Sequence, residues 1–327
     1  MSKIDFSHFY KTKFSNTEEL SRKKYDVFIS SFNESERVQT IFKDIRATEK
    51  YWIVAPEYGF ENDELPDVSN LFHNNTLLSE SEFIMNFFEK FSLIDKIKSS
   101  SFCFDITGFS RPHLIFLVKY LKHIGVDKVD MIYTDPLTYI KNEKTNFWIE
   151  FSGEPRQINF CEGSHSADTS NDLLIVGAGY DYKSIASVAE SKVKANKVQL
   201  FGFPPLKPHM YQENMLQVYK AREAIGDQKF SDNHNCLFAP ANDPFITAQI
   251  LKDFVDKENL RTPITNLYLS PLSTKAQTLG FALYFSWEFQ ESSSASMIFP
   301  ISSSYSRETT KGISNIWCYN LVLNHSE

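Results

Sequence analysis

Two short polar turns hold the residue types in this sequence that are best suited to chemistry. The turn "DITGFSRPH" (105–113) places hydroxyls, a glycine and Arg111 between a strand-like and a helix-like apolar run. The turn "SPLSTKAQ" (270–277) places hydroxyls and Lys275 in the same setting. A helix that begins in such a turn offers N–H groups and the positive end of its dipole to an anion. Each turn therefore predicts an anion site, with simple helix capping by a hydroxyl as the alternative.

A third turn, "VGAGYDYKS" (176–184), has a Gly-x-Gly between a strand and a helix. Tyr182 stands where a dinucleotide fingerprint has its third glycine, and the next strand ends in "FGFPP" without an acidic residue for a ribose. The turn thus argues against NAD(P)-dependent hydride transfer. It still permits close approach of the backbone to a phosphate or base, and a tight turn alone is the alternative. The candidate ligand-binding residues are Thr107, Ser110, Arg111, His113, Gly177, Gly179, Asp181, Ser273, Thr274 and Lys275.

No catalytic set can be assigned from the sequence. It has no HExxH motif, no GxSxG elbow and no Walker A loop, and its four cysteines form no CxxC pair. We therefore expect neither a metal nor a resident cofactor. A general acid or base could come from an aspartate near a strand end, and the candidates are Asp105, Asp135, Asp181 and Asp243.

Two further polar segments have simpler interpretations. The acidic residues between 57 and 67 show no metal-binding spacing and predict a solvated loop. The segment "YSRETTKG" (305–312) combines Arg307, Glu308 and Lys311. It predicts a solvated loop, or alternatively a lid or a salt-bridged closure.

The elements that must position these turns follow an alternating pattern. Apolar runs such as "YDVFISS" (25–31), "SFCFDIT" (101–107) and "DLLIVGAG" (172–179) alternate with amphipathic segments. This alternation is typical of mostly parallel sheets with helices on both faces. The predicted fold class is α/β with two Rossmann-like halves. We expect an N-terminal arm at 1–24, a first half at 25–150 and a second half at 151–327.

The two halves also align with one another. The sequence of Tyr25–Pro56 aligns with that of Asp172–Phe203 without a gap, and "FDITGFSRPHLIFLVKYL" aligns with "YLSPLSTKAQTLGFALYF". This match indicates an internal duplication, with chance similarity between α/β segments as the alternative. The second half then carries one extra βα insertion between its matching blocks. A duplication predicts that Arg111 and Lys275 face one another across a central cleft.

Bulk composition excludes several classes of protein. The net charge is −7 with no long basic run, which argues against a broad nucleic-acid-binding surface. The apolar stretches are too short to span a bilayer, and the N-terminus has no secretory signal. We expect a cytoplasmic protein with no membrane association.

Two resemblances follow from these motifs. "YDVFISSFNES" resembles the opening strand of TIR domains, and "LSPLSTKAQTLGFAL" is similar to the Gly-Thr-Lys turn of CARF-type Rossmann domains. Duplicated CARF-like halves also occur in SAVED domains. The second resemblance implies sensing of an oligonucleotide second messenger in prokaryotic antiviral defence, with Thr274 and Lys275 in the matching positions. Here Pro271, Leu272 and Ser273 stand in place of that turn's glycines.

The sequence leaves three functional hypotheses open. The first is a sensor or scaffold that binds a nucleotide-like anion and acts with a partner protein or as a homo-oligomer. The second is a hydrolase or transferase that acts on nucleotides with strand-end carboxylates. The third is a non-catalytic assembly subunit. The sequence is compatible with an enzyme and with a non-catalytic protein.

Overall fold

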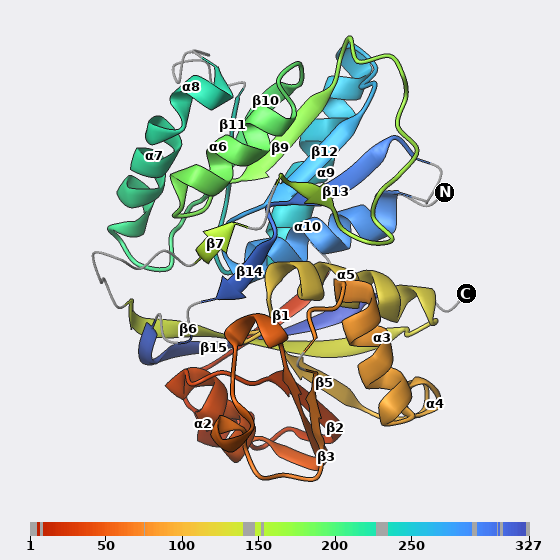
Figure 1. The fold of residues 1–327 in the computed structure, drawn as a ribbon, viewed down its shortest axis with the longest axis vertical. Helices are drawn as coiled ribbons and strands as arrows, with labels where there is room; N and C mark the ends of the chain where they lie inside the picture. Colours follow the sequence, from red (N-terminus) through yellow and green to blue (C-terminus); the bar gives the residue numbers. More distant parts are fainter. Residues whose placement is uncertain are drawn as a thin grey trace. The chain divides into compact units, whose positions relative to one another are not determined.

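The chain folds into two compact units, each built around its own sheet (Figure 1). The computed structural model describes residues 5–6, 9–74, 76–139, 148–151, 154–226, 235–289, 293–305, 307 and 310–324. The seven-stranded unit comprises the described residues of 9–113, 120–152 and 302–327. The six-stranded unit comprises those of 1–8, 114–119 and 153–301.

The seven-stranded unit takes its elements from both ends of the chain. They are β1 (Tyr10–Phe14), α1 (Thr17–Leu20), β2 (Lys24–Ser31), α2 (Glu36–Asp44), β3 (Arg46–Val54), the 3₁₀ helices η2 (Pro56–Tyr58) and η3 (Asn62–Glu64), β4 (Leu71–His73), α3 (Glu80–Lys90), α4 (Leu93–Ile97), β5 (Phe102–Asp105), α5 (Arg111–His123), β6 (Lys128–Tyr139) and β15 (Thr310–Val322). A separate two-stranded sheet pairs β7 (Trp148–Phe151) with β14 (Ser302–Tyr305). Residues 114–119 of α5 are grouped with the six-stranded unit.

The six-stranded unit is built almost entirely from one continuous stretch of chain. Its elements are β8 (Arg156–Gln157), β9 (Leu173–Gly177), α6 (Tyr182–Ser191), β10 (Asn196–Gly202), α7 (Met210–Lys220), α8 (Arg222–Ile225), β11 (Cys236–Ala239), α9 (Pro244–Arg261), β12 (Leu267–Pro271), α10 (Lys275–Glu288) and β13 (Ala295–Phe299). Its strands β9 and β13 are buried at every residue, as expected for parallel strands covered on both faces.

The parallel strands of the two sheets are arranged in the same order. The seven-stranded sheet runs β1-β15-β6-β5-β2-β3-β4, and the six-stranded sheet runs β11-β10-β9-β12-β13-β8. When the parallel strands are numbered along the chain, each sheet has the order 3-2-1-4-5 of a Rossmann fold. The predicted fold class, α/β with two Rossmann-like halves, is confirmed. The order reverses between β2 and β5 in one sheet and between β9 and β12 in the other, and these are the switch points where such folds bind ligands.

The elements that aligned in sequence occupy equivalent places in the two sheets. The units β2–α2–β3 and β9–α6–β10 match, as do β5–α5 and β12–α10. The expected extra βα insertion is wrong, because each sheet has a third parallel strand, β4 or β11. The halves differ in the crossover before that strand. It contains α7 and α8 in one unit, whereas only η2 and η3 precede β4 in the other.

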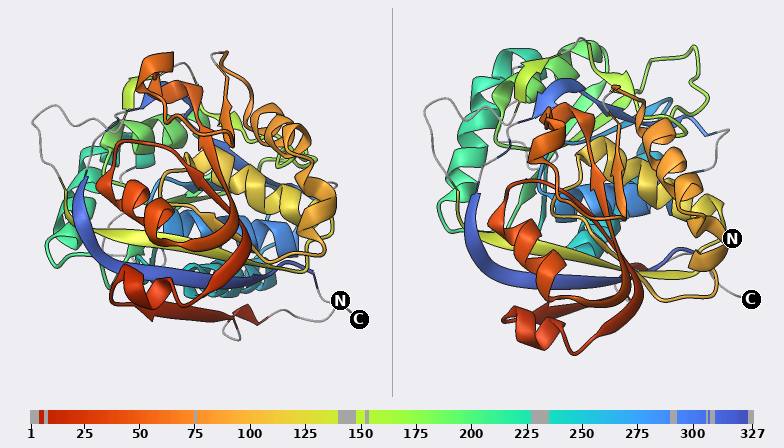
Figure 2. Two further views of the ribbon diagram at one scale, coloured as in Figure 1. Left: turned by 90° about the horizontal axis from the view of Figure 1, so that it is seen from below. Right: turned by 60° about the horizontal axis from the view of Figure 1, so that its bottom comes forward.

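The chain ends complete the seven-stranded sheet. The C-terminal strand β15 pairs antiparallel with β6 along nearly its whole length, and β1 pairs antiparallel with β15 (Figure 2). The sequence assigned β15 to the second half and the residues of β1 to a polar arm. Both are antiparallel additions to the parallel strands of the first half.

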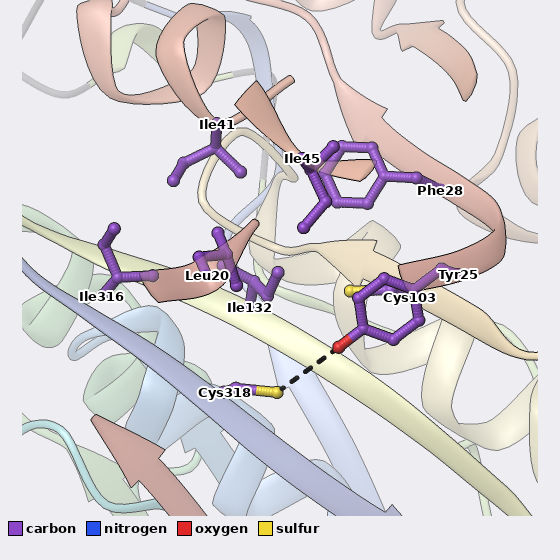
Figure 3. Packing of buried hydrophobic residues seen from close by; sticks show 9 residues of the cluster. All are labelled: Leu20, Tyr25, Phe28, Ile41, Ile45, Cys103, Ile132, Ile316 and Cys318. Carbon is purple, nitrogen blue, oxygen red and sulfur yellow. Dashed lines mark hydrogen bonds between the residues drawn. The ribbon is translucent and has the colours of Figure 1, made fainter. Parts of the chain in front are cut away.

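Helices cover both faces of the seven-stranded sheet. On one face, Leu20 of α1 and Ile41 of α2 pack on Phe28, Cys103 and Cys318 (Figure 3). On the other face, Phe88 of α3 stacks on Phe104 with ring centroids 6.4 Å apart. Within the described part of the chain, no helix has the length and apolar character needed to cross a bilayer.

Candidate functional site

The turn after β5 uses most of its polar groups to build the fold. The Ser110 hydroxyl caps α5 by accepting from the His113 N–H, and it also lies 2.6 Å from His113 Nδ1. The His113 ring is 3% exposed and packs against Phe83. These two predicted ligand residues therefore hold the start of α5. Pro112 follows the helix start, where its lack of an N–H is harmless.

Thr107 joins the same turn to the neighbouring strand. Its N–H donates to Asp105 Oδ1 at 3.0 Å, and its hydroxyl accepts from the Thr134 N–H of β6 at 3.1 Å. Thr107 is 4% exposed, so its hydroxyl is committed to the protein. Of the residues predicted in this turn, Arg111 alone is half-buried rather than buried, and it lies in the first turn of α5.

Asp105 lies at the carboxyl end of β5 and is fully buried. Its Oδ2 accepts from the Ser30 hydroxyl at 2.9 Å, which links the ends of β5 and β2 at the switch point. Burial raises the pKa of this carboxyl, although the hydrogen bonds from Thr107 and Ser30 and the charge of Arg37 oppose that shift. Among the four strand-end aspartates, Asp105 best matches the environment of a tuned acid.

The other three strand-end aspartates have structural partners. Asp181 and Asp243 cap α6 and α9 through their side chains. Asp135 accepts from Trp317 Nε1 at 2.8 Å and from Asn315 Nδ2 at 3.2 Å. Among the described residues, no group of three or more His, Cys, Asp or Glu side chains is placed to hold a metal ion.

Arg37 is the functional candidate that the sequence interpretation missed. It lies in the first turn of α2, directly after β2, and it is only 9% exposed. Its Nη1 donates to the Thr134 carbonyl, whereas its buried Nε has no hydrogen-bond partner among the residues that the structure describes. A buried N–H without an acceptor is costly and calls for an explanation. The sequence signal was weak, because an arginine in "ESERVQTIF" is typical of a solvated helix face.

The charges of Arg37 and Arg111 both lower the pKa of the same two tyrosines, Tyr58 and Tyr133. Burial raises the pKa of the Tyr133 hydroxyl to about 12, and the charges of both arginines oppose that shift. Burial also raises the pKa of Tyr58, and again both arginines oppose it. The two guanidinium groups therefore converge on one region at the carboxyl ends of β2, β5 and β6. They come from the two helices that follow the switch-point strands.

The segment after β3 extends this region. The Tyr58 hydroxyl donates to the Gly108 carbonyl at 3.2 Å, so η2 lies against the turn that precedes α5. Arg307 holds the segment in place by donating to the carbonyls of Tyr58 and Gly59 and to both carboxylate oxygens of Glu64. The solvated acidic loop expected at 57–67 is thus anchored, and the 305–312 segment supplies a salt bridge to it. Glu308 lies outside the described residues.

The polar turns of the six-stranded unit are occupied by their own chain. Thr274 caps α10 by accepting from the Gln277 N–H, and its hydroxyl donates to the Ala241 carbonyl at 2.5 Å. Asn214 of α7 donates to the carbonyls of Ala178 and Gly179. Ser273 is 3% exposed, and its Oγ would lie 2.9 Å from a Cβ at Gly177. Lys275 is half-buried in the first turn of α10.

Two turns approach each other closely beside the switch point in both units. A Cβ at Gly108 would lie 1.9 Å from the Ser31 carbonyl oxygen, and a Cβ at Gly179 would lie 2.2 Å from the Leu272 carbonyl oxygen. Gly108 belongs to the turn after β5, whereas Gly179 belongs to the turn after β9. The two sheets therefore have the same contact, with the glycine supplied by opposite partners. Packing of the chain on itself explains both glycines without a ligand.

The structure thus brings Arg111 together with Arg37, Tyr58 and Tyr133, none of which the sequence had singled out. The pairing of Arg111 with Lys275 across a cleft stays a prediction. Comparison with protein-family models gives no matching family, and comparison with curated proteins gives no match.

Proposed function

We propose that the seven-stranded unit binds an anionic, nucleotide-like ligand at the carboxyl ends of β2 and β5. The observation that carries this proposal is the position of Arg37 and Arg111, which lie in the first turns of the two helices that follow the switch-point strands of a Rossmann sheet. Ligands of open α/β sheets bind at this place. The unpartnered Nε of Arg37 is a donor that a phosphate oxygen could satisfy.

Two helix N-termini support the same conclusion. Helices α2 and α5 both begin at this edge, so their dipoles add to the two guanidinium charges. The Ser35 side chain makes no capping hydrogen bond to α2, which leaves that terminus without this common source of stabilisation. An anion would therefore be favoured here even though the whole chain has a net charge of −7.

The biological role that we propose is that of a sensor or scaffold that acts with a partner protein or as an oligomer. The resemblance of the 270–277 turn to CARF and SAVED domains supports a role in antiviral signalling. In that turn, the residues matched to the family are Thr274, which is engaged in capping, and the half-buried Lys275.

The test is calorimetric titration of the full chain with ribonucleotides, short oligoadenylates and inorganic phosphate. Arg111→Gln should weaken binding roughly tenfold or more, because a hydrogen bond to a charged group is lost. The matched control is Arg46→Gln, which removes an exposed arginine at the opposite end of the same sheet. Binding that survives in Arg111→Gln, or that falls equally in Arg46→Gln, contradicts the proposal. If no probe binds and the chain co-purifies with another protein, it is an assembly subunit.

Asp105 favours a second candidate function, a hydrolase or transferase that acts on a nucleotide. A carboxyl with a raised pKa at the switch point could donate a proton to a leaving group. Asp105→Asn should then abolish turnover of the bound nucleotide and leave its affinity nearly unchanged. A ligand that binds and is recovered intact after long incubation with the native chain argues for the sensor.

A further inference from the structure

Glu57 has a carboxylate oxygen that no group in the described part of the chain satisfies. Its Oε2 is buried and has no hydrogen-bond donor within the described residues. Glu57 lies in η2, three residues after the end of β3. The seven-stranded unit thus contains one buried acceptor without a donor, Glu57 Oε2, and one buried donor without an acceptor, Arg37 Nε, among its described residues.

The place of Glu57 in the topology is informative. Strand β3 comes second among the parallel strands along the chain, so it is strand 2 of the order 3-2-1-4-5. Rossmann folds that bind dinucleotides place an acidic residue at this position, where it accepts hydrogen bonds from ribose hydroxyls. The matching position in the six-stranded unit follows β10 and reads Phe203, Pro204 and Pro205, so only the seven-stranded unit has such an acid there.

The surrounding contacts hold this acid in place. Tyr58, the next residue, is fixed through its hydroxyl to the Gly108 carbonyl and through its own carbonyl to Arg307 Nε at 2.9 Å. The Arg307 guanidinium also lies over the Phe60 ring, 4.3 Å from its centroid. A carboxylate held by a rigid segment loses little entropy when a ligand binds, which favours recognition.

We propose that Glu57 accepts hydrogen bonds from the vicinal hydroxyls of a ribose, so that the ligand of this site is a ribonucleotide. This inference rests on the proposed anion site at Arg37 and Arg111. A bare phosphate would leave Glu57 Oε2 unsatisfied and would be repelled by the carboxylate. A ribonucleotide offers its phosphate to the arginines and its hydroxyl donors to Glu57, and therefore satisfies both.

The experiment compares the affinities of ribonucleoside monophosphates with those of their 2′-deoxy and 3′-deoxy forms and of inorganic phosphate. The native chain should bind the ribonucleotide roughly tenfold more tightly than either deoxy form, as expected for one hydrogen bond to a charged group. Glu57→Ala should bind all three nearly equally and bind inorganic phosphate at least as well as the native chain. Glu57→Gln, which keeps the side-chain size, guards against a loss of folding and should also lose the ribose preference.

The matched control is Asp63→Asn, which removes an exposed negative charge from the same segment and should keep the ribose preference. If the native chain binds phosphate groups through Arg111 but shows no ribose preference, or if Glu57→Ala retains it, the inference is wrong and the anion site stands. If no nucleotide and no phosphate binds the native chain, both the inference and the proposed function are wrong.

Discussion

Asp105 shows how one buried carboxyl links stability to the proposed chemistry. Burial raises its pKa in the folded protein, so the folded state holds the proton more tightly than the unfolded chain does. The stabilisation from this group is therefore present below the unfolded pKa, about 3.9, and is lost as the pH rises through the raised folded value. Asparagine has no such proton to lose.

We therefore predict that Asp105→Asn becomes more stable relative to the native chain as the pH rises above about 4, the ordinary pKa range of an aspartate. Urea unfolding at a series of increasing pH values measures the difference. The gain should level off once Asp105 is ionised in the folded protein. A stability difference that stays constant with pH would show that the pKa of Asp105 is not raised.

Asp130 anchors a second polar network, at the opposite ends of the strands. Tyr25 Oη donates to Asp130 Oδ2 at 2.7 Å, Lys23 Nζ donates to the same oxygen at 3.0 Å, and Asn320 Nδ2 donates to Oδ1 at 2.5 Å. Tyr25 Oη also lies 3.9 Å from Cys318 Sγ (Figure 3). Burial raises the pKa of the Cys318 thiol to about 12, so this thiol stays protonated and unreactive at neutral pH.

We predict that Asp130→Ala is more destabilising than Tyr25→Phe. The alanine leaves the buried Tyr25 hydroxyl without its acceptor, which costs about 1–3 kcal/mol. The phenylalanine removes the donor and leaves Asp130 with Lys23 and Asn320, at a cost of about 1 kcal/mol. Equilibrium denaturation gives both values. Equal losses would mean that the network acts through Tyr25 packing rather than through the carboxylate.

The residues that sequence reasoning placed well are those whose role is local. Ser110 and Thr274 cap the two helices that match in sequence, which was the alternative to an anion site in each turn. Arg37 and Glu57 could not be identified in this way. The burial of Arg37 results from a strand distant in the chain, since Arg37 contacts the Thr134 carbonyl of β6. No local pattern distinguishes them from solvated charges.

At the scale of elements, the turns at the switch points set the separation of the helices that follow. Gly108→Ala would force its Cβ to within 1.9 Å of the Ser31 carbonyl oxygen, and Gly179→Ala to within 2.2 Å of that of Leu272. Backbone atoms cannot move aside cheaply, so each alanine should cost about 3 kcal/mol or more. The control is Gly125→Ala, where no atom lies within 4 Å and only the φ of +80° is unfavourable. That strain costs about 1–2 kcal/mol.

Thermal unfolding of the three variants tests this comparison. Because Gly108 belongs to the turn that carries Arg111, Gly108→Ala should also weaken nucleotide binding, whereas Gly179→Ala should reduce stability alone. If Gly108→Ala proves no worse than Gly125→Ala, the turn can relax, and the close approach is not required by the fold.

The alternation of elements was sufficient to predict two parallel sheets, because each strand is followed by a helix of recognisable periodicity. The prediction failed where a strand is not followed by a helix in this way. Strand β4 has three residues and follows β3 without a regular α-helix between them, so it has neither the length nor the crossover that marks a strand. The missed strand made the first half look one βα unit shorter than the second.

At the scale of the molecule, the two sheets differ in how much of the chain they need. The strands of the six-stranded sheet all come from 156–299, whereas the seven-stranded sheet needs strands from 10–14 and from 310–322. Contacts between such distant segments form late, because closing a long loop comes at an entropic cost. The seven-stranded unit, with its proposed site, should therefore depend on the C-terminal strand.

We predict that a chain ending at Tyr305 loses the seven-stranded unit and keeps the six-stranded one. The deletion removes the partner of both β6 and β1, along with the fully buried side chains of Ile316, Tyr319 and Leu323. Each buried apolar side chain contributes about 1.5–3 kcal/mol, so the loss is comparable with the total stability of a domain, about 5–15 kcal/mol. Hydrogen exchange should show protected amides in β9, β10 and β12 and fast exchange in β2 and β5. Protection that persists in β2 would mean that the parallel strands fold without β15, and nucleotide binding should then persist in the truncated chain.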